Sequence, residues 1–146
     1  MLRLNSRARY GLLALVALAE DGGDEFVGAQ ELARRRSIPP KYLGQILALL
    51  VQAGVVAGRR GSGGGYKLAV SPFAITLDRV LLALGASDIS PRCIYGVDRG
   101  TCTLPYRQAK CDGIGPAEEA AMAVLASTTL ADMCPGYAKD EPSYQI

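Results

Sequence analysis

The sequence predicts a mainly α-helical protein with one small β-hairpin and a long C-terminal helix. Three observations predict it. Apolar residues in 41–53 recur at the spacing of one helix face, a glycine-serine turn separates two short apolar runs at 55–57 and 66–70, and 116–133 carries a stripe of small residues. With 146 residues, 49% of them hydrophobic and 21% charged, the chain can form one core with an appendage.

The first part of the chain predicts two helices. Asn5 or Ser6 can cap a helix over 8–20, which is rich in Leu and Ala, and a turn follows at 21–24. A short second helix is expected over Gln30–Arg36, where it ends in three consecutive arginines.

A tight turn at 37–40 leads into a third helix over Lys41–Ala53. Pro40 suits the first helical position, and Gly54 suits the position just after the end. Four apolar residues of this helix share one face and are expected to be buried: Leu43, Ile46, Leu47 and Leu50.

The segment Arg59–Leu68 predicts the long turn of a hairpin. Its glycines allow positive φ at several positions without steric cost. A nucleotide-binding loop is excluded by spacing, because Lys67 follows Tyr66 instead of glycine and a strand follows instead of a helix. On this stretch alone, an ordinary surface hairpin remains an alternative.

The order helix, short helix, tight turn, helix and hairpin is that of a winged helix-turn-helix, whose second helix enters the DNA major groove while the wing reaches the backbone or minor groove. Residues 1–71 carry ten Lys or Arg and five Asp or Glu, net +5, whereas residues 72–146 carry six and nine, net −3. A basic front of this kind suits a polyanion, although charged faces are often simply solvated. The expected DNA-binding residues lie on the third helix and the wing: Lys41, Tyr42, Gln45, Arg59, Arg60, Gly63, Gly64 and Tyr66.

The C-terminal half predicts two more helices. Thr76 is expected to cap a helix over 77–84 that Gly85 closes, and a final helix is expected from Pro116 to about Met133. The stripe on the final helix comprises Ala121, Val124, Leu125, Thr128 and Ala131. A second copy of this helix is the expected cover, which predicts a homodimer; packing on the first helix of the same chain is the alternative. The resulting organisation is 1–85 (winged helix-turn-helix), 86–115 (cysteine-bearing loop), 116–134 (dimerisation helix) and 135–146 (polar tail).

The chain has four cysteines and no histidine. Cys93, Cys102 and Cys111 are separated by eight residues each within the loop, and the fourth is Cys134. Three thiolates in a loop with little core of its own predict an iron-sulfur cluster or another soft metal site. Redox-active or inert thiols are the alternatives. The length of the final helix argues against Cys134 as fourth ligand. A carboxylate such as Asp98 or Asp112, a backbone or small-molecule group, and a residue of a partner subunit remain candidates.

Other classes of protein fit less well. No apolar run is long enough to span a bilayer and no signal peptide is evident, so a cytoplasmic location without membrane association is expected. A thiol oxidoreductase would need a Cys-x-x-Cys pair or a base beside the thiol, and neither is visible, so no enzyme is predicted.

Several motifs resemble the IscR/NsrR-type winged-helix regulators. They are Arg9-Tyr10-Gly11, Pro40-Lys41-Tyr42-Leu43, Ala53-Gly54-Val55-Val56, the Arg60–Leu68 wing and Thr129–Asp132. The resemblance implies a dimeric bacterial transcription factor in which Arg60 takes the place of a minor-groove arginine and Lys41 and Gln45 fall on base-reading positions.

The same resemblance implies an iron-sulfur cluster, [2Fe-2S] or [4Fe-4S], on Cys93, Cys102 and Cys111, whose state alters DNA affinity in response to iron, redox state or nitric oxide. The chain departs from that pattern in the eight-residue cysteine spacing, in the absence of histidine after Cys111, and in Arg9, which stands where some members have a carboxylate. Some members of the family carry no cluster and respond to a protein partner, and a cluster-free regulator acting through reactive thiols or such a partner is the alternative.

Overall fold

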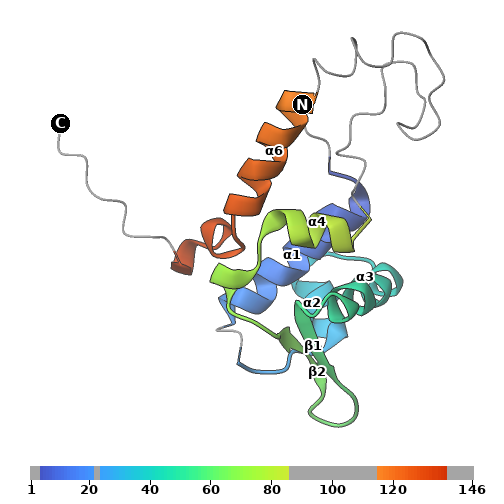
Figure 1. Cartoon of the computed structure of the whole chain (residues 1–146). Helices are drawn as coiled ribbons and strands as arrows, with labels where there is room; N and C mark the ends of the chain where they lie inside the picture. The colour runs from blue at the N-terminus through green and yellow to red at the C-terminus, as the bar shows by residue number, and fades with distance from the viewer. Residues whose placement is uncertain (1–3, 22–23, 86–114, 138–146) are drawn as a thin grey trace.

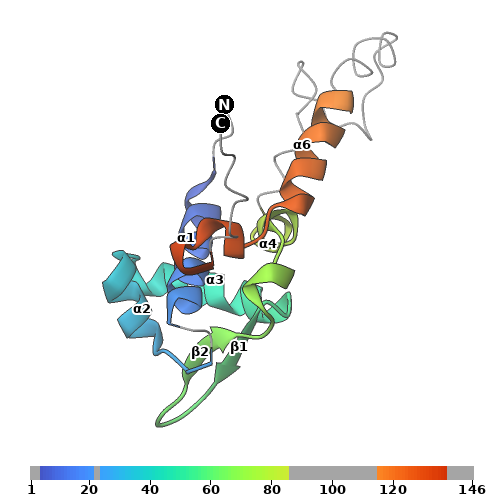
Figure 2. The same cartoon turned by 90° about the vertical axis from the view of Figure 1, so that its left-hand side faces the viewer.

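The helices and the hairpin follow one another in the predicted order. The computed structural model describes residues 4–21, 24–85 and 115–137 of the chain. Its main elements are α1 (Ser6–Glu20), α2 (Ala29–Arg36), α3 (Pro40–Gln52), β1 (Val56–Arg59), β2 (Gly65–Leu68), α4 (Leu77–Ala83) and α6 (Gly115–Ser127). Short 3₁₀ turns lie at Pro72–Ala74, Ala131–Met133 and Pro135–Tyr137. Helices α1 to α4 pack together, the hairpin projects from one end of this body, and α6 extends away from it (Figures 1 and 2).

Helix α1 runs through the middle of this body. Its N-cap is Asn5, one of the two residues that the sequence offered, and the Asn5 side chain accepts a hydrogen bond of 2.8 Å from the backbone nitrogen of Ala8. At Gly11 an added Cβ would overlap the Leu84 side chain and lie 3.4 Å from Ile46. A glycine here therefore lets α1, α3 and α4 approach one another closely.

The tight turn between α2 and α3 is formed by Ser37, Ile38 and Pro39. Ser37 adopts a left-handed conformation with φ of 52°, which ends α2, and Ile38 is buried. Pro40 is the first residue of α3, and the four apolar residues predicted to face the core are all buried. Gly54, with φ of 69°, follows the end of α3 as predicted.

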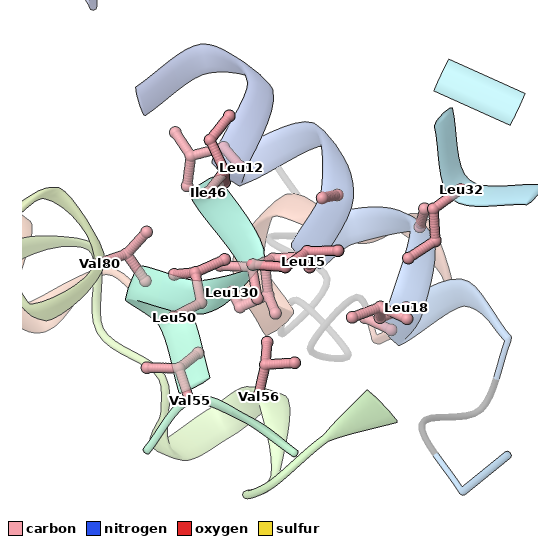
Figure 3. Close-up of a cluster of buried hydrophobic side chains, with 14 of the residues drawn as sticks. Leu12, Leu15, Leu18, Leu32, Ile46, Leu50, Val55, Val56, Val80 and Leu130 are labelled. Carbon is pink, nitrogen blue, oxygen red and sulfur yellow. The ribbon is translucent and has the colours of Figure 1, made fainter. Parts of the chain in front are cut away.

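One hydrophobic core joins all of these elements. Figure 3 shows side chains converging on it from both helices of the helix-turn-helix, from α1 and α4, from the hairpin and from the segment after α6: Leu12, Leu15, Leu18, Leu32, Ile46, Leu50, Val55, Val56, Val80 and Leu130. The core therefore fixes α3 and the hairpin relative to each other, which is what a bipartite binding surface requires.

The last helix is shorter than the sequence predicted. It ends at Ser127, and the expectation of a single helix to about Met133 was wrong. The chain instead turns back, because Leu77 donates to the carbonyl of Thr128 (2.9 Å) and Leu130 donates to that of Ile75 (2.8 Å). Next to this short antiparallel bridge, Leu130 is completely buried in the core.

Two further expectations about this region need correction. Thr128 and Ala131, predicted on the helical stripe, lie beyond α6. Thr76 occupies the N-cap of α4 but makes no capping hydrogen bond through its side chain, and its backbone pairs with Thr129. Within the described residues, no helix is long and apolar enough to cross a membrane.

Candidate nucleic-acid interface

The exposed face of α3 carries three of the predicted DNA-binding side chains. Lys41, Tyr42 and Gln45 are all exposed, because the opposite face of the helix is committed to the core. Lys41 and Gln45 are one turn apart at the N-terminal end, and neither side chain has a hydrogen bond or an ion pair within the described part of the chain. Both are therefore available to an external ligand.

Tyr42 is held in place by an aromatic contact. Its ring packs edge-on against Tyr10 of α1 with 6.1 Å between the ring centroids, and the Arg9 guanidinium lies 5.3 Å from the Tyr10 centroid. The Tyr42 side chain nevertheless stays 44% exposed. Helix α1 thus orients a tyrosine at the start of α3 without covering it.

The wing turn needs the glycines that the sequence places in it. Gly61 and Gly63 have φ of 95° and 71°, and the backbone nitrogen of Gly64 donates to the Gly61 carbonyl at 3.0 Å. A Cβ on Gly64 would lie 2.8 Å from the Gly61 carbonyl oxygen and would collide with that of Arg59. The prediction of several positive φ angles in this turn is confirmed.

A third segment supports the wing. The backbones of Val27 and Tyr66 form an antiparallel bridge, with hydrogen bonds of 2.9 Å from Val27 to Tyr66 and 2.8 Å in the other direction. Gly65 has φ of 143°, and a Cβ there would strike the Val27 carbonyl. The segment that leads into α2 therefore lies directly against β2. A local sequence pattern does not predict a single bridge between residues as distant in sequence as Val27 and Tyr66.

The two wing arginines have different surroundings. The Nη2 atom of Arg59 donates to the Gly63 carbonyl at 2.5 Å, and its guanidinium lies 4.3 Å from the centre of the Phe26 ring. Lys67 places its ammonium 5.1 Å from the same ring. Arg60 is exposed and has no hydrogen-bond or ion-pair partner among the residues described. Sequence reasoning did not single out Phe26, since a lone aromatic before a helix carries no pattern.

A hollow of about 310 Å³ separates α3 from the wing. Its lining comes from both: Ala48, Val51, Gly58, Arg59, Arg60 and Tyr66. The Tyr66 ring lies under Gly58, where an added Cβ would be 3.3 Å from the ring. The hollow thus has apolar and aromatic side chains between α3 and the wing, and of the two arginines that line it only Arg60 has no partner within the described residues.

The three arginines that end α2 are paired within the protein. Arg34 contacts Glu31 at 2.9 Å, and Arg35 contacts both Glu31 (2.8 Å) and Asp21 (2.5 Å). The hydrogen bonds from Arg34 and Arg35 lower the pKa of Glu31 to about 2. Arg36 forms an ion pair with Glu20 of α1. These charges are balanced locally, and they join α2 to the end of α1.

The cysteines fall into two groups. Cys93, Cys102 and Cys111, predicted to hold a cluster, lie outside the described residues. Cys134 is 2% exposed within the core, and burial raises the pKa of its thiol, which disfavours the thiolate form that binds metals. Over residues 4–21, 24–85 and 115–137, no group of three His, Cys, Asp or Glu side chains is placed to hold a metal ion.

Comparisons with known proteins agree with this fold. Residues 4–136 match the Rrf2 family model, described as iron-dependent transcriptional regulators. The HTH-type transcriptional regulator IscR of Cereibacter sphaeroides is 39% identical over 85 residues, covering 57% of this chain and 55% of that protein. IscR of Vibrio cholerae is 34% identical over 92 residues, covering 63% and 53%. The chain thus spans about half the length of these curated relatives.

Solved structures give the same result. IscR of T. potens superposes with a TM-score of 0.69 at 27% identity, covering 90% of this chain and 85% of that one. CymR, the global cysteine regulator of B. subtilis, superposes with a TM-score of 0.72 at 29% identity, covering 95% and 100%.

Proposed function

Because this chain belongs to the Rrf2 family of transcriptional regulators, we propose that it binds double-stranded DNA as a homodimer and that thiols of the 86–115 segment control the binding. Its relatives are transcriptional regulators and not enzymes. The observation that carries the DNA-binding part is that α3 and the wing each expose a cation without a partner among the described residues, Lys41 and Arg60. Lys41 and Gln45 would contact base edges in the major groove, and Arg60 would contact phosphate or the minor groove.

The salt dependence of DNA binding tests this surface. Each phosphate contact that a cation makes contributes about 0.9 to the slope of log K against log salt concentration. Operator DNA selected from random sequences should bind the wild-type chain, and R60A should weaken binding and lower the slope by about that amount. R34A is the matched control, since it removes an arginine that is paired with Glu31. Equal slopes for wild type and R60A would contradict the role of the wing.

The sensing site that we propose is an iron-sulfur cluster on Cys93, Cys102 and Cys111. Thiolates are the ligands that iron-sulfur clusters prefer, so three cysteines are chemically suited to hold one. When bound, the cluster would supply a redox-sensitive and iron-sensitive centre that joins the segment before α6 into one unit. The chain's own part is to provide three ionised thiols and to connect them, through α6 and the bridge at Thr129, to the DNA-binding body.

Anaerobic purification with iron and sulfide analysis tests the cluster. A coloured protein with both elements is expected, and replacing any one of the three cysteines by alanine should remove them. C134A is the matched control, because the buried Cys134 should not be a ligand. A colourless protein with stoichiometric zinc would exclude the cluster.

A cluster-free regulator is the second candidate. It is favoured by the likeness to the B. subtilis cysteine regulator, which this chain matches over the full length of that structure. In that case the purified protein would lack iron and sulfide, and its DNA affinity would change with thiol oxidation or on addition of a protein partner.

The exposed apolar residues of α4 and α6 support the homodimer. Leu82 is 70% exposed, Val124 63% and Met122 41%. Helix α6 extends away from the rest of the described structure (Figure 2). Light scattering should report a dimer for the wild type and a monomer for V124E. V70E, which places the same charge on an exposed valine outside α4 and α6, should leave the dimer intact. A monomeric wild type would contradict this part of the proposal.

A further inference from the structure

Phe26 contacts two cations of the wing at once. The Arg59 guanidinium lies 4.3 Å and the Lys67 ammonium 5.1 Å from the centre of its ring. Both distances are within the range of cation–π attraction. Phe26 is half-buried, and its neighbour Val27 pairs with Tyr66 through two backbone hydrogen bonds, so the ring is fixed beside the wing.

Arg59 is in turn bound to the tip of the wing. Its Nη2 atom donates to the Gly63 carbonyl at 2.5 Å. This hydrogen bond connects the end of β1 to the opposite side of the turn. Lys67 makes a longer hydrogen bond from β2, because its ammonium donates to the Asp24 carbonyl at 3.5 Å. The turn is rich in glycine and would otherwise sample many conformations, since glycine has the greatest backbone freedom.

We propose that Phe26 is a positioning residue for the wing, holding Arg59 against the turn so that Arg60 alone of the two arginines contacts DNA. The inference rests on the proposed DNA-binding function. Ordering the turn before DNA arrives removes part of the entropic cost of binding. Arg59 thus acts through the wing's shape, whereas Arg60, without a partner among the described residues, acts through its charge.

The test uses a substitution that changes no charge. In the full chain, F26L removes the π face and should weaken operator binding by roughly 3- to 10-fold while leaving the salt slope unchanged. F26Y keeps an aromatic face and should bind within about twofold of wild type.

The arginine variants separate shape from charge. R60A should lower the slope of log K against log salt concentration by about 0.9. R59Q combined with F26L should weaken binding little more than either change alone, because the two residues act as one unit.

A second measurement needs no DNA. Amide hydrogen exchange at Gly63 and Gly64 should become faster in F26L and stay unchanged in F26Y, with the thermal midpoint showing that both variants fold. Unaltered exchange and affinity in F26L would overturn the inference. The inference would also be overturned if R59Q lowered the slope of log K against log salt concentration as much as R60A does, since Arg59 would then contact phosphate itself. If the wild type fails to bind DNA, the proposed function fails, and the exchange measurement still decides whether Phe26 orders the wing.

Discussion

The end of α2 and the wing both concentrate arginine, but only the wing offers an arginine to a ligand. At the end of α2, Arg34, Arg35 and Arg36 are all paired with carboxylates of α1, α2 or the following turn. In the wing, Arg59 is bound to Phe26 and Gly63, and Arg60 has no partner in the described part of the chain. Charge present in a sequence is therefore not the same as charge available for binding.

This difference changes the meaning of the basic N-terminal half. Three of its five acidic residues, Glu20, Asp21 and Glu31, are the partners of the α2 arginines. The pairs with Glu31 lie within α2, whereas those with Asp21 and Glu20 join α2 to the end of α1. Outside α2, the described cations without an ion-pair partner include Arg7 and Arg9 on α1 as well as Lys41 on α3 and Arg60 in the wing. Only α3 and the wing line the hollow that we propose for a DNA strand.

The largest expected effect separates the two regions by DNA affinity. K41Q removes an unpaired cation on α3 and should weaken operator binding about 5- to 100-fold, or about 1–3 kcal/mol. R34Q removes a paired cation of α2 and should weaken it less than about threefold. Fluorescence anisotropy with the same operator measures both. Similar losses for the two variants would erase the distinction between available and paired charge.

A second prediction concerns the shape of the wing. G65A introduces a Cβ at φ of 143° that strikes the Val27 carbonyl, so it should lower the free energy of unfolding by about 1–2 kcal/mol. G44A is the control within α3: nothing lies within 4 Å of an added Cβ there, and it should stabilise the helix by up to about 1 kcal/mol. Urea unfolding gives both values, and a neutral G65A would mean that the Val27 bridge is not held tightly.

A third prediction addresses the link between α1 and α2. R36A removes the ion pair with Glu20 and should destabilise the protein by about 0.5–1 kcal/mol, since the Arg36 side chain is only 27% exposed. E20A should cost a similar amount, and the double variant should cost less than the sum. Strict additivity would show that this pair contributes nothing to stability.

The smallest effect is a pH dependence of α2. The pKa of Glu31 is lowered from 4.5 to about 2 in the folded chain, so its carboxylate stabilises the fold fully above pH 4.5, and this contribution is lost as the pH falls toward 2. A carboxyl carbon NMR titration should find a midpoint for Glu31 near 2. The stability difference between wild type and E31Q should likewise shrink over that pH range. A midpoint near 4.5 would indicate that Arg34 and Arg35 do not hold the carboxylate.

Local patterns explain which parts of the fold were predictable. The buried face of α3, the Asn5 cap and the positive φ angles of the wing follow from residues within one or two helical turns of each other. The Val27–Tyr66 bridge and the end of α6 at Ser127 depend on partners distant in the sequence. In α6, helical composition favoured continuation, and the burial of Leu130 against the core prevailed.

The candidate site divides in the same way. Lys41, Tyr42, Gln45 and the glycine turn were predictable, because exposure on α3 follows from helix periodicity and turn chemistry follows from residue type. By itself the sequence thus determined the winged helix-turn-helix order and the residues that face outward. Only the tertiary structure decided which cations are already paired and that the Arg59 guanidinium lies against the Phe26 ring while Arg60 has no partner among the described residues. The physical reason is that pairing depends on distances of a few ångströms between segments that only packing of the core brings together.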